Sequence, residues 1–358
     1  MTTTIETENF QEIIDGIPSE LYVLKNHQGI EATISNYGLR LVSLLVPDRE
    51  NVCKDVVLGF AKLDTYKHID GAYFGCIIGQ YANRIANGRF QLGNEICQLD
   101  QNNGPNHLHG GSTGYHSVAW KATNITANSL TFEKTFHEHT NGYPGNTTVT
   151  VTYSLTEENS FDIHYKATTD IRTIINLTNH SFFNLKGEGN GNIEDHKLMI
   201  NADQYLPVNA QLIPNQGLQP VANTVFDFRT AKTIGQDLHK KNEQLSSAQG
   251  YDHNYVIDQA QKDKESMVLA AIVSEEQSGR VMTVYTSEPG MQFYSGNHIS
   301  SKLIGKQGKA YQPRSGFCLE TQHFPNSPNN NDFPSVELAP GESYESRTRY
   351  QFSILKEE

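Results

Sequence analysis

The sequence predicts an all-β protein, built as one large antiparallel β-sandwich with few short helices. Long runs alternate apolar and polar residues, Asn, Gly, Asp and Pro recur between these runs, and helical periodicity is scarce. Period-2 alternation is typical of strands with one buried and one solvated face, and the intervening residues are those that favour turns. No linker or internal repeat divides the chain, so we expect a single domain over residues 1–358.

The alternation is clearest between residues 148 and 165, where Val, Tyr, Leu, Phe and Ile alternate with polar residues. A polar loop at 156–160 divides this run, which predicts a β-hairpin. Similar runs at 129–136, 280–286 and 348–355 predict further strands. Residues 60–66 and 233–238 could each form a helical turn or two.

The composition excludes several classes of partner. The chain has 28 basic and 40 acidic residues, for a net charge of −12. Nucleic-acid binders usually carry a basic footprint, and an acidic protein gains nothing from anionic lipids. No apolar run approaches the ~18 residues of a membrane span. We therefore expect no nucleic acid and no membrane as partners.

The cysteines and the first residues bear on location. The four cysteines form no C-x-x-C pair, so they indicate neither a zinc site nor a redox motif. The first residues, MTTTIETE, lack the basic start and apolar core of a secretory signal. Free thiols and a cytoplasmic location are expected.

Two polar stretches of catalytic type lie in the first third of the chain. Residues 79–85 (GQYANRI) place Arg84 among small and apolar residues, and this stretch alone favours a structural arginine paired with a carboxylate. Residues 106–111 (NHLHGG) put His107 and His109 on one side if the segment is extended. A pair without a third ligand does not make a metal site. The two glycines allow a close turn beside a ligand.

Three further candidates follow. His180 comes after a β-type run and before two aromatic residues; it is either a general acid or base or a packed histidine. Glu320 ends a short apolar run, and a buried glutamate is rare unless it is paired or functional. Asp252, in GYDHN at 250–254, is a second acidic candidate in a turn setting.

No other chemistry is indicated. The chain has no G-x-S-x-G motif, no P-loop and no G-x-G-x-x-G after a predicted strand. The residues by themselves indicate an all-β protein suited to a neutral polyol or sugar.

Taken together and in this order, these stretches resemble the aldose 1-epimerase (galactose mutarotase) family. The resemblance rests on GQYANRI (79–85), NHLHGG (106–111), TNHSFFNL (178–185), GYDHN (250–254), PGMQFYSGN (289–297) and LETQHFP (319–325). It runs from about Asn36 nearly to the C-terminus. It implies the family's large β-sandwich, and an isomerase that interconverts the α and β anomers of free aldohexoses such as galactose and glucose without a metal or organic cofactor.

The resemblance also implies roles for particular residues. By motif, Glu320 resembles the general base and His180 the general acid. The implied substrate-binding residues are His109, Arg84 and Asp252, with Asn83 and Gln292 as weaker candidates, and Phe293 could pack on the sugar. Ordinary pKa values of about 4.3 and 6.5 would keep the glutamate ionised and the histidine partly protonated near neutrality.

Three alternatives stay open. The chain could act on hexose phosphates, it could be a glycosidase that uses Glu320 and Asp252, or it could bind sugars without catalysis. The sequence does not rank galactose over glucose. The resemblance implies a site that needs no second chain, so a monomer or weak homodimer is expected.

Overall fold

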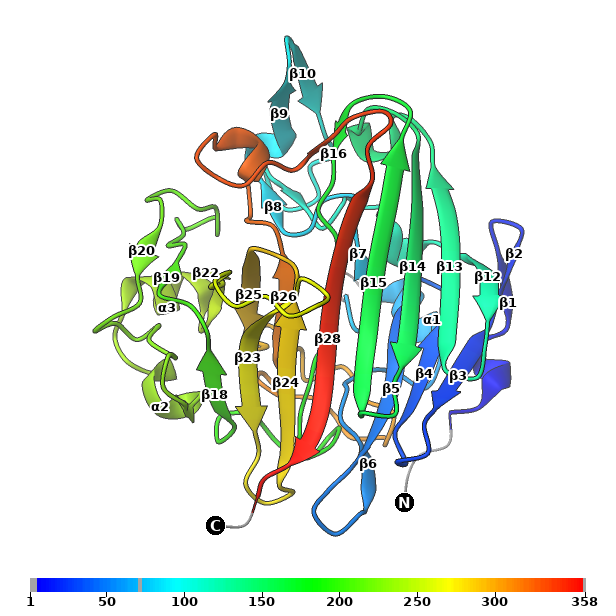
Figure 1. The fold of residues 1–358 in the computed structure, drawn as a ribbon, viewed down its shortest axis with the longest axis vertical. Coiled ribbons are helices and arrows are strands. Elements are labelled where there is room, and N and C mark those ends of the chain that lie inside the picture. Colours follow the sequence, from blue (N-terminus) through cyan, green and yellow to red (C-terminus); the bar gives the residue numbers. More distant parts are fainter. Residues whose placement is uncertain (1–4, 70–72, 357–358) are drawn as a thin grey trace.

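A computed structural model describes residues 5–69 and 73–356. Every pairing between its named strands is antiparallel, so the predicted all-β architecture is confirmed (Figure 1). Within the described residues, no helix combines the length and the apolar character that a membrane crossing requires.

The largest layer is a nine-stranded sheet in the order β12-β13-β14-β15-β28-β24-β23-β18-β21. Its long strands lie side by side across Figure 1, with the C-terminal strand β28 in the middle. The strands are β12 (Lys121–Ile125), β13 (Ser129–Phe136), β14 (Thr147–Leu155), β15 (Ser160–Thr169), β18 (Lys197–Ile200), β21 (Lys232–Thr233), β23 (Val268–Ser274), β24 (Arg280–Thr286) and β28 (Tyr344–Ile354).

Two smaller sheets accompany it. The five-stranded sheet has the order β20-β19-β22-β25-β26 and the four-stranded sheet the order β3-β4-β5-β6. Their strands are β19 (Gln204–Tyr205), β20 (Gln219–Pro220), β22 (Asp252–Val256), β25 (Gly290–Tyr294), β26 (Cys318–Gln322), β3 (Leu21–Lys25), β4 (Glu31–Ser35), β5 (Arg40–Pro47) and β6 (Cys53–Asp55).

Short ribbons and helices complete the described part of the chain. The ribbons pair β1 (Glu12–Ile14) with β2 (Ile17–Ser19), β9 (Arg89–Leu92) with β10 (Glu95–Gln98), β8 (Arg84–Ile85) with β11 (His107–Leu108), β16 (Thr173–Ile174) with β27 (Glu337–Leu338), and β7 (Ile77–Ile78) with β17 (Thr178–Asn179). The α-helices are α1 (Leu63–His68), α2 (Gly235–Leu238) and α3 (Glu243–Ala248). The 3-10 turns are Thr7–Phe10, Ala86–Gly88, Tyr115–Ser117, Thr140–Gly142 and Ser327–Asn329.

One hydrophobic core joins the three sheets. It contains Leu24 from β3, Val151 from β14 and Leu319 from β26, all buried. The alternation explains how these strands reach it, because the odd-numbered residues of β14 are buried while Thr148, Thr150, Thr152 and Ser154 are half-buried. A large apolar area is thereby removed from water, which is the main driving force for folding.

The predicted hairpin is confirmed as β14 and β15, paired from Thr147↔Thr169 to Leu155↔Phe161. Asn159 in its loop has a φ of 61°, which asparagine tolerates better than most residues. The expected helical turns correspond to α1 and α2. The sequence reading missed α3, although its start is signalled by Asn242, whose side chain accepts hydrogen bonds from the backbone N–H groups of Gln244 and Leu245.

Candidate active site

A polar pocket of about 250 Å³ opens beside the five-stranded sheet. Its polar lining includes Asn83, Arg84, His109, His180, Asp252 and Glu320. Its apolar walls include Phe74, Leu108, Phe182, Tyr294, Ile299 and Leu303. The polar lining thus gathers residues from five of the stretches that the sequence singled out.

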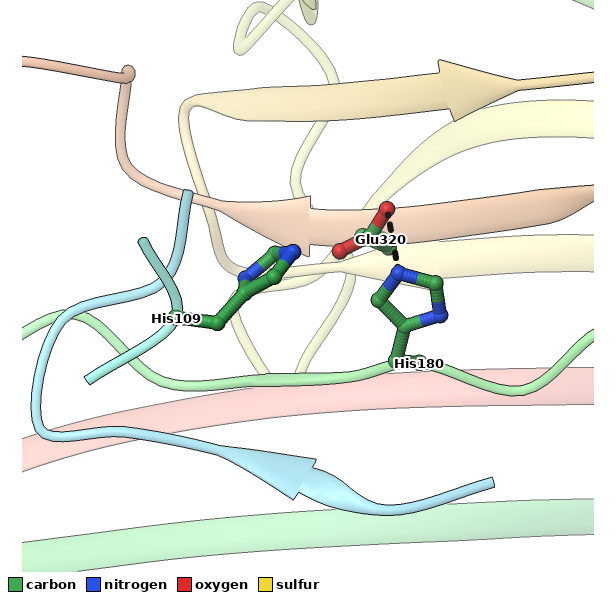
Figure 2. A group of neighbouring side chains, drawn as sticks. All are labelled: His109, His180 and Glu320. Carbon is green, nitrogen blue, oxygen red and sulfur yellow. Dashed lines mark ion pairs between the residues drawn. The ribbon is translucent and has the colours of Figure 1, made fainter. Parts of the chain in front are cut away.

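Glu320 lies at the middle of β26 and is buried, as the sequence predicted. Its Oε1 lies 3.7 Å from the Nε2 of His180. Figure 2 shows this pair, with His109 beside it. Within the described part of the chain, Glu320 Oε2 makes no hydrogen bond, so one carboxylate oxygen remains available to a ligand.

The backbone of His180 is fixed by its neighbour segment. β17 pairs with β7 just before His180, and the His180 N–H donates to Cys76 O at 2.9 Å. Its carbonyl oxygen accepts from the N–H of Gly75 at 3.0 Å. The side chain is held as well: Nδ1 lies 3.5 Å from the Sγ of Cys318, and the Phe182 ring centroid lies 4.9 Å from the imidazole.

Burial changes the acid–base properties of this pair. Burial, reinforced by the nearby Asp252 carboxylate and opposed by Arg84, raises the pKa of Glu320 well above its ordinary value. Burial lowers the pKa of His180 to about 4. The unperturbed values assumed from the sequence are therefore wrong for this site, because the desolvated pocket favours the neutral form of both groups.

His109 is held by the segment that carries Asn83. The backbone N–H of Asn83 donates to His109 Nδ1 at 3.2 Å, and the N–H of His109 donates to Asn83 O at 3.1 Å. Both residues have positive φ, 64° for Asn83 and 52° for His109. β11 ends at Leu108, so His107 and His109 do not share a side. His107 instead bonds to the Tyr143 hydroxyl at 2.7 Å in the interior.

Arg84 and Asp252 both line the pocket, and the side chain of each bonds to an amide. Arg84 is half-buried, and its Nε donates to Asn103 Oδ1 at 3.0 Å; the expected carboxylate partner is replaced by an amide. Asp252 begins β22 rather than lying in a turn. Its Oδ1 accepts from Gln292 Nε2 at 2.6 Å. Gln292 lies outside the described pocket lining and acts on it through Asp252.

The expectation for Phe293 is wrong. Its ring is fully buried in the core and stacks on the ring of Tyr251, with the two ring centroids 5.2 Å apart. Since neighbouring strand residues point to opposite faces, Gln292 faces the site and Phe293 cannot.

Tyr73 is a site residue that the sequence reading missed. Its ring centroid lies 4.6 Å from that of His109 and 5.7 Å from that of His180. It packs against both imidazoles, and it lies in an irregular segment without a recognisable pattern. Its neighbour Phe74 and the segment 298–303 were missed for the same reason.

His109, His180 and Glu320 could also be considered as metal ligands, since their ligand atoms lie within 4.8 Å of one another. The position of His109 does not fit that role. Its Nδ1 accepts from a backbone N–H, so the neutral ring carries its proton on Nε2 and has no lone pair there for a metal. The Nε2–H of His109 is better suited to donating a hydrogen bond to oxygen.

A large antiparallel β-sandwich whose pocket holds a buried contact between a glutamate and a histidine suits an enzyme that acts on sugars. The profile of the aldose 1-epimerase family matches residues 20–351. The galactose mutarotase of Sus scrofa is 42% identical over 337 residues, which cover 94% of each chain. The aldose 1-epimerase of Escherichia coli K12 is 38% identical, over 94% of this chain and 96% of that one.

A solved structure agrees. An aldose epimerase homologue from C. elegans matches with a TM-score of 0.86 and 30% identity, covering 94% of this chain and all of that one. This chain therefore belongs to the aldose 1-epimerase family. The family, the fold and the class of isomerase acting on sugars are confirmed as predicted from the sequence.

Proposed function

We propose that the protein interconverts the α and β anomers of free aldohexoses such as galactose and glucose, with Glu320 as general base and His180 as general acid. The observation that carries the proposal is the buried contact between their side chains, 3.7 Å from Oε1 to Nε2, in a polar pocket. An anomer is inverted by opening the hemiacetal ring, which requires a base and an acid at once.

The proton path begins with the ion-pair form of the two residues. Glu320 removes the proton of the C1 hydroxyl while His180 Nε2–H protonates the ring oxygen, and the C1–O5 bond breaks. The open aldehyde rotates about C1–C2 and closes on its other face. The two residues, now neutral, act in reverse for closure.

Burial strengthens both groups for this work. A raised pKa makes Glu320 a stronger base and a lowered pKa makes His180 a stronger acid. The empty pocket favours the neutral pair, so the sugar must stabilise the ionised one. Hydroxyl groups that donate to Glu320 provide such stabilisation, because hydrogen bonds to a carboxylate favour its charged form.

The remaining polar residues are proposed to hold the sugar. His109 offers an Nε2–H donor, Arg84 offers charge-assisted N–H donors and Asp252 accepts from hydroxyl groups. Asn83 fixes His109 through its backbone, and Gln292 fixes the carboxylate of Asp252.

The charges of the pocket favour a free sugar over a sugar phosphate. Two carboxylates, Glu320 and Asp252, accompany Arg84, which is the only lysine or arginine among the described lining residues. A phosphate group would add negative charge without a second fixed cation to receive it.

Polarimetry on freshly dissolved α-D-galactose, in a weakly catalytic buffer, tests this proposal. We expect a faster approach to the same final rotation with the protein than without it, and a smaller kcat/KM on galactose 6-phosphate. Methyl α-D-galactopyranoside, which has no free C1 hydroxyl, should keep its rotation. A galactose decay equal to that of buffer would contradict the proposal, and a changing rotation of the methyl glycoside would instead indicate a glycosidase.

The protein is further proposed to act as a single domain in the cytoplasm, as a monomer or weak homodimer. The hydrophobic core shared by the three sheets supports one domain. The proposed base, the proposed acid and the polar lining residues come together within this one chain, which supports a site that works without a partner subunit. Cys53, Cys76, Cys97 and Cys318 are free thiols, as is usual in a reducing compartment.

A further inference from the structure

Cys318 is a fully buried thiol beside the proposed acid. It begins β26, two residues before Glu320. Residues two apart on a strand point to the same face, so both side chains reach the face where the imidazole of His180 lies. Sγ is 3.5 Å from Nδ1 and Oε1 is 3.7 Å from Nε2. One strand thus contacts both ring nitrogens.

We propose that Cys318 is a positioning residue for His180: its sulfur accepts the Nδ1–H hydrogen bond, so that Nε2 is the nitrogen that exchanges a proton with the sugar. The inference rests on the proposed role of His180 as the acid. In the imidazolium form both nitrogens carry protons. After Nε2–H has protonated the ring oxygen, the proton on Nδ1 remains and still faces Sγ.

The identity of this partner has a chemical consequence. A carboxylate at Nδ1 would stabilise the imidazolium and weaken the acid, whereas a neutral thiol is only a weak acceptor. The thiol therefore orients the ring and leaves the acid strong. Burial, with Glu320 and Asp252 nearby, raises the pKa of Cys318 well above its usual value, which keeps the sulfur in the neutral form.

Without Cys318, Nδ1 would be a buried polar atom with no side-chain hydrogen-bond partner among the described residues. Such groups are rarely left unpaired, and a ring without that contact can turn about its Cβ–Cγ bond. Ring rotation would move Nε2 away from Glu320, so the effect should fall on the chemical step rather than on sugar binding.

The test compares Cys318→Ala with Cys318→Ser and with the control Cys97→Ala. Cys97 is a half-buried thiol on β10 and lies outside the described pocket lining. Polarimetry on α-D-galactose should show a kcat about three- to tenfold lower for Cys318→Ala, the range for one lost hydrogen bond, with KM changed less than about twofold. Serine, which restores an acceptor, should recover most of the loss, and Cys97→Ala should match wild type.

A two-bond ¹H–¹⁵N spectrum of the intact protein gives a second readout that does not depend on activity. We expect neutral His180 to carry its proton on Nδ1 in wild type and in Cys318→Ser, and to lose this preference in Cys318→Ala. The His180 signals are assigned by their absence in His180→Asn. A wild-type Nε2–H tautomer, or the same tautomer and kcat in Cys318→Ala as in wild type, would overturn the inference.

An equal loss of kcat in Cys97→Ala would also overturn it, since the effect would then be a general one of removing a thiol. Absence of mutarotase activity in wild type would contradict the proposed function. The spectrum would in that case still decide whether Cys318 holds Nδ1.

Discussion

β14 in the nine-stranded sheet and β26 in the five-stranded sheet are both antiparallel strands in the same hydrophobic core. Along β14, apolar residues are buried and their polar neighbours are half-buried. Along β26, all five residues are buried, including the polar Glu320 and Gln322. Burying polar groups is costly, so β26 carries a cost that β14 avoids.

The difference arises from what covers the second face. The polar face of β14 meets solvent, whereas that of β26 lies under the segment that carries His180 and beside the pocket. Buried polar residues on a strand, such as those of β26, therefore mark the side of the sandwich where the pocket lies.

The largest expected effect is on kcat, and it should distinguish the buried Glu320 of β26 from an exposed glutamate of the nine-stranded sheet. Glu320→Gln should lower kcat about 10²- to 10⁴-fold, the usual contribution of one general base, because an amide cannot accept the C1 hydroxyl proton. Glu133→Gln on β13, where the side chain is exposed, should leave kcat unchanged. Polarimetry measures both variants, and circular dichroism checks that each is folded. Full activity in Glu320→Gln would remove Glu320 as the base.

A smaller effect is expected at the sugar-holding residues. His109→Asn should lower kcat/KM about tenfold, mainly through KM, because one hydrogen bond to the sugar is lost. Asparagine suits the positive φ of this position and its Oδ1 can accept the Asn83 N–H. Initial rates over a range of galactose concentrations give the two constants. A change confined to kcat would instead place His109 in the chemical step.

The apolar side of the nine-stranded sheet should respond in stability alone. Ile163 on β15 is buried in the core. Ile163→Val should lower the free energy of unfolding by about 0.5–1.5 kcal/mol through the loss of one methyl group, as measured by urea denaturation. The kcat and KM of the folded variant should equal those of wild type. A changed kcat or KM would mean that packing in the nine-stranded sheet influences the site at the five-stranded sheet.

The smallest effect is a shift of a pH profile. The reacting form needs an ionised Glu320 and a protonated His180, while the empty pocket favours both groups neutral. The alkaline limb of kcat/KM should therefore follow the raised pKa of Glu320, and the acid limb the lowered pKa of His180. The Asp252 carboxylate contributes to the raised pKa of Glu320, and Asp252→Asn removes that charge. The pKa of Glu320 should fall and the alkaline limb should move to lower pH, whatever the change in KM. An alkaline limb that stays in place would assign it to another group.

The sequence predicted the sandwich and singled out most of the polar residues that line the pocket, because both depend on local patterns. Alternation located β14 and β15, and the apolar run before Glu320 placed that residue in the interior. Long-range order was not predictable: β28 pairs with both β15 and β24, and no local pattern fixes that position. The contact of Cys318 with His180 joins residues 138 positions apart.

Backbone conformation accounts for the other differences. His109 does not share a side with His107 because its φ is positive, which alternation alone does not reveal. Asp252 lies in β22, which the sequence did not reveal because the partner strand β25 begins 38 residues further along the chain. Tyr73 belongs to an irregular segment, where only the tertiary structure brings its ring to both imidazoles.

The most direct test of the account is the mutarotation rate of α-D-galactose with the double variant Glu320→Gln/His180→Asn, compared with each single variant. Residues that act together in one step have strongly non-additive effects. If Glu320 and His180 form one acid–base pair, the double variant should be no more than about threefold slower than the slower single variant. A double variant whose loss equals the product of the two single losses would contradict the account, because it would show that the two residues act independently.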